Sequence, residues 1–156
     1  MSSHRVEASR VVAVDAARAF DALLATPRQS IFARGFAAFP PVDDVRDQQG
    51  DWDTVGQSRT LLLGDGGSVQ ETLTSVDRPH SFGYVLDDIH GRLRPFVTSI
   101  DGVWSVAQED GGSRISWAWT MHPAAPPARL TMTVIGRLWQ GYADLALKRV
   151  EAMLTT

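Results

Sequence analysis

The stretch from about residue 127 to residue 154 constrains the fold most, because it has the pattern of one long amphipathic helix. Apolar residues recur there at spacings of three and four, which marks one buried helical face. The stripe consists of Leu130, Val134, Leu138, Tyr142, Leu145 and Val150, flanked by Met132, Ile135, Trp139, Ala146 and Met153. At about 1.5 Å per residue, this helix is roughly 42 Å long. Its apolar stripe must therefore be covered by another layer of the protein.

The chain before this helix has the pattern of short strands joined by turns. Strands are predicted at residues 5–14, 42–48, 55–63, 68–76, 80–86, 95–108 and 114–121. Asp15 is a suitable N-cap for an alanine-rich helix over residues 16–24, and Pro27 can open a second short helix over residues 28–33. The order is strand, two short helices, about six antiparallel strands and a long helix. This order predicts an α+β fold whose long helix packs on the sheet.

Composition excludes several classes of protein. The chain has no cysteine, which rules out disulfides, thiol catalysis and zinc–thiolate sites. The formal net charge of −3, with interspersed signs, argues against a nucleic-acid binder. No signal-like segment, membrane-length apolar run or pair of histidines at ligand spacing is present. We expect residues 1–156 to form one cytoplasmic domain without metal or cofactor, and leave monomer or homodimer open.

A hairpin around residues 64–67 carries the most informative polar pattern. Its inward faces should hold Val69, Glu71 and Leu73 on one strand and Arg59, Leu61 and Leu63 on the other. Counting back from the turn places Leu61 near Glu71, with Arg59 one step further along the same face. A buried carboxylate and a buried guanidinium are each costly alone, so we expect Arg59 and Glu71 to pair. The pair is either a functional feature of the interior or a structural ion pair.

Aromatic residues dominate the inward faces of the later strands. The predicted inward sets are Ile115, Trp117, Trp119 and Met121 on the last strand, Phe96, Thr98, Ile100, Trp104 and Val106 on the preceding one, and Phe82, Tyr84 and Leu86 before it. Such residues either fill a core or line an apolar pocket that contains a few polar groups.

Several motifs make the chain resemble a known superfamily. They are residues 50–56 (GDWDTVG), Arg59-Thr60, Gly66-Gly67, Asp77-x-Pro79, Phe82-x-Tyr84, Gly102-x-Trp104, Gly111-Gly112-x-Arg114-Ile115-x-Trp117 and Gly136-Arg137-Leu138-Trp139. Over nearly its whole length the chain resembles the START-like (SRPBCC) superfamily, in its bacterial polyketide cyclase/dehydrase and lipid-transport branch. The resemblance implies a helix-grip fold, in which a curved antiparallel sheet of about seven strands wraps round the long helix and leaves a cavity.

The resemblance also implies a first hypothesis for function, the binding of a small apolar or amphipathic ligand such as a lipid or polyketide. Phe32, Phe36 and Phe39 would lie near the mouth of the cavity. The lining would comprise Leu61, Leu63, Leu73, Tyr84, Phe96, Trp104, Trp117, Trp119, Leu138, Trp139 and Tyr142. Arg59 and Glu71 would orient a polar end of the ligand. The opposing view is that the aromatics fill the cavity.

Two alternatives remain open. A polyketide cyclase or dehydratase needs a general acid and base, for which Glu71 and Tyr84 are candidates, with Arg59 stabilising an enolate. His80 is a further catalytic candidate, while His90 and His122 belong to a loop and a strand end. The third possibility is a protein-interaction module with a filled core.

Overall fold

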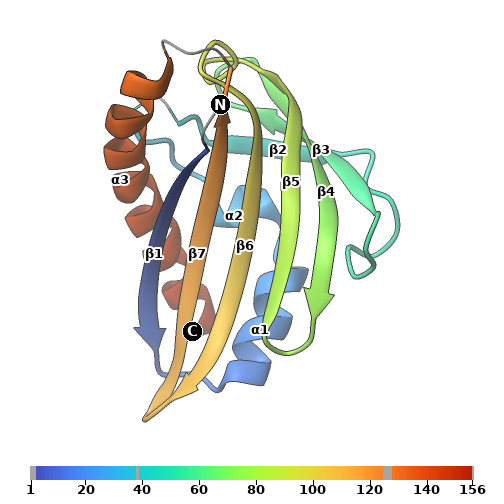
Figure 1. Cartoon of the computed structure of the whole chain (residues 1–156). Helices are drawn as coiled ribbons and strands as arrows, with labels where there is room; N and C mark the ends of the chain where they lie inside the picture. Colours follow the sequence, from blue (N-terminus) through green and yellow to red (C-terminus); the bar gives the residue numbers. More distant parts are fainter. Residues whose placement is uncertain (1–2, 38, 125–127, 156) are drawn as a thin grey trace.

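The structure of the protein is a computed structural model that describes residues 3–37, 39–124 and 128–155 (Figure 1). Its elements in chain order are β1 (His4–Val12), α1 (Ala16–Ala25), α2 (Arg28–Ile31), β2 (Val42–Arg46), β3 (Ser58–Leu63), β4 (Ser68–Asp77), β5 (Ser81–His90), β6 (Val97–Glu109), β7 (Gly112–Pro123) and α3 (Ala128–Leu154). The predicted order is confirmed. The predicted helix start at residue 127 lies outside the described residues, as does the side chain of Leu130.

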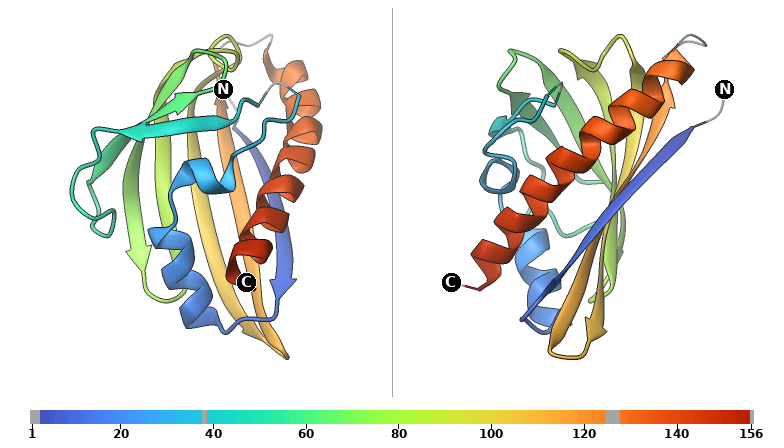
Figure 2. Two further views of the ribbon diagram at one scale, coloured as in Figure 1. Left: turned by 180° about the vertical axis from the view of Figure 1, so that it is seen from behind. Right: turned by 90° about the vertical axis from the view of Figure 1, so that its left-hand side faces the viewer.

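The seven strands form one antiparallel sheet in the order β1-β7-β6-β5-β4-β3-β2. The sheet is curved, and all three helices lie on one side of it (Figure 2). Strand β1 closes one edge by pairing with β7, and the long helix α3 runs beside this edge. This is the helix-grip arrangement, so the predicted fold class is confirmed.

The short helix α1 begins where its capping residue predicts. The side chain of Asp15 accepts a hydrogen bond from the backbone nitrogen of Arg18 at 3.1 Å, which satisfies one free N–H group of the first turn. Its buried residues are Ala19, Phe20, Leu23 and Leu24. This apolar face packs α1 against one end of the sheet. Helix α2 follows α1 in the chain.

Helix α3 buries a face that is rotated from the predicted one. Val134 and Leu145 are exposed (55% and 37%), and Leu138 is half-buried. The buried stripe is instead Met132, Ile135, Trp139, Tyr142, Ala143, Ala146, Leu147, Val150 and Leu154. Gly136 lies so close to β1 that an added Cβ would come within 3.1 Å of the Val6 side chain. The small residues on the buried face let the helix approach the sheet closely. The spacing of apolar residues alone did not identify this face as the buried one.

The predicted inward face of β6 is wrong at its beginning. Thr98 is exposed and Phe96 precedes the strand in a turn, whereas Val97 and Ile100 are buried. A register irregularity between Val97 and Ser99 inserts one residue and reverses the alternation at this point. From Ile100 onward the predicted inward residues are confirmed, and Trp104 and Val106 are both buried.

Candidate functional site

A cavity of about 60 Å³ lies between the concave side of the sheet and the helices α2 and α3. Its walls are mainly apolar and aromatic, with a few charged groups. The lining residues are Arg28, Phe32, Phe39, Pro40, Val42, Leu61, Leu63, Asp65, Val69, Glu71, Tyr84, Leu86, Ile89, His90, Arg92, Leu93, Ile100, Trp117, Trp119 and Tyr142. The sheet side is therefore supplied by strands β2 to β7, and the cover by α2, the segment that follows it and α3.

The structure brings about half of the predicted ligand-contacting residues to this cavity. Those that line it are Leu61, Leu63, Glu71, Tyr84, Trp117, Trp119 and Tyr142. Those that do not are Arg59, Leu73, Phe96, Trp104, Leu138 and Trp139. Leu73, Trp104 and Trp139 are buried in the core around the cavity. Trp104 lies behind Trp117, with stacked rings whose centroids are 5.0 Å apart.

Phe32, Phe39 and Tyr142 form an aromatic wall on the helix side of the cavity. The ring of Tyr142 stacks on Phe32 at 5.4 Å and on Phe39 at 5.1 Å between centroids. Phe36, the third predicted mouth residue, is exposed and does not line the cavity. A groove of about 310 Å³ lies on the other side of this wall, and Phe32 and Tyr142 line both spaces. The aromatic wall therefore separates the cavity from a larger groove between α2 and α3.

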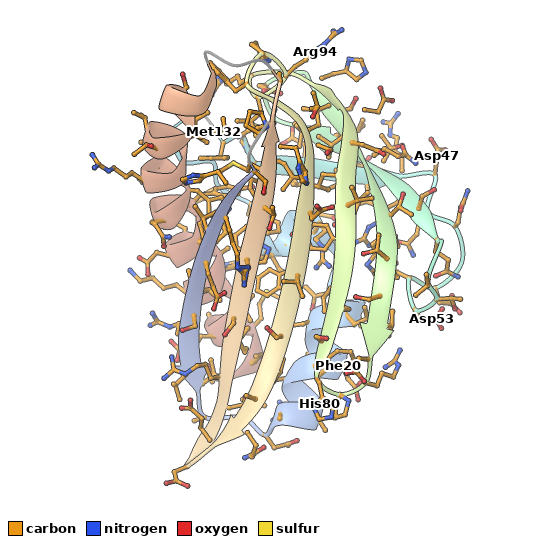
Figure 3. The ribbon with its side chains drawn as sticks, in the orientation of Figure 1. Phe20, Asp47, Asp53, His80, Arg94 and Met132 are labelled. Atoms are coloured by element: carbon orange, nitrogen blue, oxygen red, sulfur yellow. The ribbon has the colours of Figure 1, made fainter. Side chains whose placement is uncertain are left out.

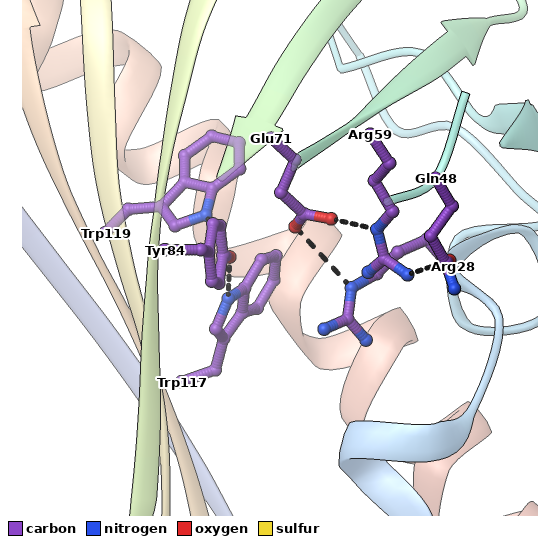
Figure 4. Close-up of polar contacts among 7 residues, drawn as sticks. All are labelled: Arg28, Gln48, Arg59, Glu71, Tyr84, Trp117 and Trp119. Carbon is purple, nitrogen blue, oxygen red and sulfur yellow. Dashed lines mark hydrogen bonds and ion pairs between the residues drawn. The ribbon is translucent and has the colours of Figure 1, made fainter. Parts of the chain in front are cut away.

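Three charged side chains are buried together at the cavity: Arg28, Arg59 and Glu71 are 1%, 3% and 1% exposed. The predicted pair of Arg59 and Glu71 is confirmed, with 2.7 Å between Nε and Oε1 (Figure 4). The predicted register was off by one pair, because Arg59 lies directly opposite Glu71 and Leu61 opposite Val69. Arg28 Nε lies 3.6 Å from Oε2 of the same carboxylate. One carboxylate is thus placed between two guanidinium groups.

Arg59 is held from the side away from the cavity. Its Nη1 donates to Oε1 of Gln48 at 3.2 Å, and its guanidinium carbon lies 3.7 Å from the ring centroid of Trp52. Burial lowers the pKa of Arg59 to about 10, although the Glu71 carboxylate acts in the opposite direction. Arg59 therefore stays charged near neutral pH and holds the Glu71 carboxylate from a position outside the cavity lining.

The hydroxyl of Tyr84 belongs to β5, the strand next to that of Glu71, and lies on the sheet side of the cavity. Its oxygen accepts hydrogen bonds from the indole nitrogens of Trp117 at 2.8 Å and Trp119 at 3.1 Å (Figure 4). Burial raises the pKa of Tyr84 to about 12, and the charge of Glu71 adds to this effect; the two indole hydrogen bonds oppose it. Gly102 lies opposite Tyr84 in the ladder, and an added Cβ there would collide with the phenol ring. The ring is thus positioned against the bare backbone of β6.

Arg28 and the residues at the cavity mouth belong to the site although no sequence pattern indicated them. Arg28 is the first residue of a short helix, a position that usually faces solvent, so no local pattern indicated its burial. At the mouth, Asp65 accepts hydrogen bonds from the backbone nitrogens of Gly67 at 2.8 Å and Arg92 at 3.0 Å. The glycine-rich turn predicted the hairpin, but only the fold shows that Asp65 ties it to the turn after β5.

His80, a catalytic candidate from the sequence, is remote from the cavity. It is exposed near Phe20, at the end of the sheet opposite Arg94 (Figure 3). His122 is paired with Asp101 at 2.7 Å outside the cavity. Within residues 3–37, 39–124 and 128–155, no cluster of three metal-ligating side chains occurs, and no helix has the length and apolar character needed to cross a membrane.

Comparisons with known proteins agree with this architecture. A family model described as "Polyketide cyclase / dehydrase and lipid transport" matches residues 3–155. Norcoclaurine synthase from Thalictrum flavum, solved with dopamine and hydroxybenzaldehyde, has a TM-score of 0.72 at 15% identity, covering 98% of this chain and 87% of its own. No curated protein matches the chain.

Two further solved structures superpose over almost their whole length. Major latex-like protein 151 from Panax ginseng has a TM-score of 0.70 at 15% identity, with 100% of both chains covered. A protein from Nitrosospira multiformis has a TM-score of 0.68 at 17% identity, covering 98% of this chain and 97% of that one. At these identities the likeness concerns the fold.

Proposed function

Because this chain belongs to the polyketide cyclase/dehydrase and lipid transport family, we propose that it binds a small apolar or amphipathic molecule between its sheet and α3. The observation that carries the proposal is the cavity itself. Apolar and aromatic side chains from both layers converge on it, together with the few polar groups of Arg28, Glu71 and Tyr84. Apolar walls with a small number of placed polar groups are typical of sites for small organic ligands.

The size of the cavity bears on how such a ligand is accommodated. Ligand sites commonly measure roughly 300–1,000 Å³, whereas this cavity measures about 60 Å³. A displacement of Phe32 would join the cavity to the groove of about 310 Å³ behind it, because Phe32 lines both. We infer that the ligand takes its space from this aromatic wall, since the opposite wall is fixed by the strand ladder.

The fold neighbour with bound aromatic molecules supports the same class of ligand. Norcoclaurine synthase was solved with dopamine and hydroxybenzaldehyde, both small and aromatic. A cavity lined by Trp117, Trp119 and Tyr142 offers comparable aromatic surfaces for stacking. A lipid or polyketide of greater length would have to extend into the groove.

The cyclase or dehydratase alternative receives less support from the geometry. Both carboxylate oxygens of Glu71 face guanidinium groups, Oε1 at 2.7 Å from Arg59 Nε and Oε2 at 3.6 Å from Arg28 Nε. Glu71, the predicted general base, is therefore already engaged in ion pairs. Tyr84, with a pKa of about 12, keeps its proton near neutral pH and can donate a hydrogen bond but not act as a base there. The interaction-module alternative is also weaker, since the exposed large apolar side chains of the described residues are scattered over β1, two loops and two separate turns of α3: Val11, Phe36, Val55, Val134 and Leu145.

Native mass spectrometry of freshly purified protein, followed by solvent extraction, tests the proposal. We expect an added mass that organic solvent removes, or a thermal shift with members of a lipid and polyketide panel. Val69→Phe, which fills the cavity, should lower the retained fraction, while Val134→Phe on the exposed face of α3 should not. A clean unliganded mass without any thermal shift would refute binding and favour a filled core.

A further inference from the structure

The buried charges at the cavity do not balance. Arg28 and Arg59 each carry one positive charge, and Glu71 supplies one negative charge, all three being at most 3% exposed. Asp65, the other carboxylate in the lining, lies at the mouth and is satisfied by two backbone N–H groups. The inner end of the cavity is therefore left with one excess buried positive charge, which is costly without a counterion.

The excess charge belongs to Arg28. Among the described residues, none of its three guanidinium nitrogens has a hydrogen-bond partner, although all three are shielded from solvent. Its closest carboxylate oxygen, on Glu71, is 3.6 Å from Nε, which is beyond hydrogen-bond distance. Arg59, by contrast, donates to Glu71 and Gln48 and does not line the cavity. Arg28 is thus the buried donor that the cavity offers.

A second donor comes from the sheet side of the cavity. The oxygen of Tyr84 accepts from both indoles, so its own hydrogen remains available for an acceptor. Both Arg28 and Tyr84 line the cavity. Two donors to which the described part of the chain supplies no acceptor therefore line the same space.

We propose that the cavity selects apolar molecules that carry a carboxylate, with the carboxylate oxygens received by Arg28 and Tyr84. This inference rests on the proposed function, because it names the polar group of the ligand that the cavity binds. A planar carboxylate matches the fork of a guanidinium and would supply the missing negative charge. The aromatic wall and the strand side would then enclose the apolar body of the ligand.

Calorimetric titration with two probes of nearly equal shape, 2-naphthoate and the uncharged 2-naphthamide, tests this selectivity. We expect the wild-type protein to bind the carboxylate about tenfold to a hundredfold more tightly. In Arg28→Met the ratio of the two affinities should fall close to one. Arg137→Met removes the same charge from an exposed position on α3 and should leave the ratio unchanged.

The outcomes separate this inference from the proposed function. Equal affinities of the wild-type protein for both probes would overturn carboxylate selection while leaving apolar binding intact. A failure of the wild-type protein to bind either probe would overturn this inference, whereas the native mass spectrum and the lipid and polyketide panel decide the proposed function. If Arg28→Met does not fold, the wild-type ratio still decides, and Arg28→Lys should retain a preference for the carboxylate.

Discussion

Replacing Glu71 by glutamine should destabilise the protein far more than the same change at the surface. The substitution keeps the shape of the side chain but leaves the guanidinium groups of Arg59 and Arg28 without their shared carboxylate, at 2.7 Å and 3.6 Å. Removing one partner of a buried ion pair costs about 3–5 kcal/mol. Because a glutamine oxygen can still accept one hydrogen bond from Arg59, we expect a loss near the lower end, about 3 kcal/mol.

The protein offers a closely matched control. Arg114 and Glu109 also form an ion pair through Nε and Oε1 at 2.7 Å, but their side chains are 43% and 37% exposed. Glu109→Gln should therefore cost at most about 1 kcal/mol. Urea unfolding followed by tryptophan fluorescence gives both free energies of unfolding by linear extrapolation. Equal losses in the free energy of unfolding for the two variants would refute the reasoning that burial makes the Glu71 ion pair more important for stability than an exposed one.

Arg28 extends the same experiment through a double-variant cycle. If Arg28 is an excess charge, Arg28→Met alone should cost less than Glu71→Gln, because it removes a buried group that has no hydrogen-bond partner among the described residues. In the double variant the total loss should be smaller than the sum of the single losses. Strict additivity would show that Arg28 and Glu71 do not interact.

Three further predictions follow from the site. The chain has two tyrosines, Tyr84 and Tyr142, and burial raises the pKa of both, that of Tyr84 from 10.0 to about 12. Ultraviolet titration of the folded protein should therefore show no phenolate near pH 10, and ionisation there without unfolding would contradict the buried positions. Because both tyrosines have a higher pKa in the folded protein than in the unfolded chain, their full contribution to stability is present below about pH 10 and is lost as the pH rises above it. The pKa of Arg59 is lowered by folding, so its contribution to stability changes with pH in the opposite direction and offsets part of this loss. Gly102→Ala should displace the Tyr84 ring and cost about 1–3 kcal/mol, measured by urea unfolding; an unchanged midpoint would contradict the close packing. Phe32→Ala should open the cavity to the groove, costing about 3–5 kcal/mol while increasing the fluorescence of an added apolar dye; unchanged dye fluorescence would contradict the wall.

Local patterns predicted the fold because residues typical of helix caps and tight turns mark where the strands and helices of this chain begin and end. Asp15 caps α1, and the glycine-rich turn at residues 64–67 closes the hairpin between β3 and β4. Two-residue alternation also placed Arg59 and Glu71 on one buried face. These features depend on interactions between neighbours in the sequence or across one turn.

The errors arose where position depends on distant parts of the chain. The irregularity at the start of β6 changes the phase of the alternation, so Phe96 and Thr98 were wrongly directed inward. Both candidate faces of α3 contain apolar residues, and the contact of Gly136 with β1 decides between them. Arg28 is buried only because α2 folds back over the sheet, which no local period indicates.

The central claim, that small apolar molecules bind between the sheet and α3, is tested most directly by the indole N–H signals of the tryptophans. In a ¹⁵N–¹H spectrum recorded during titration with 2-naphthoate, the signals of Trp117 and Trp119 should shift, because both line the cavity beside Tyr84. Trp52, which packs on Arg59 outside the lining, serves as the internal control and should stay in place. A titration that saturates without moving the signals of Trp117 and Trp119, or that moves Trp52 alone, would contradict the account.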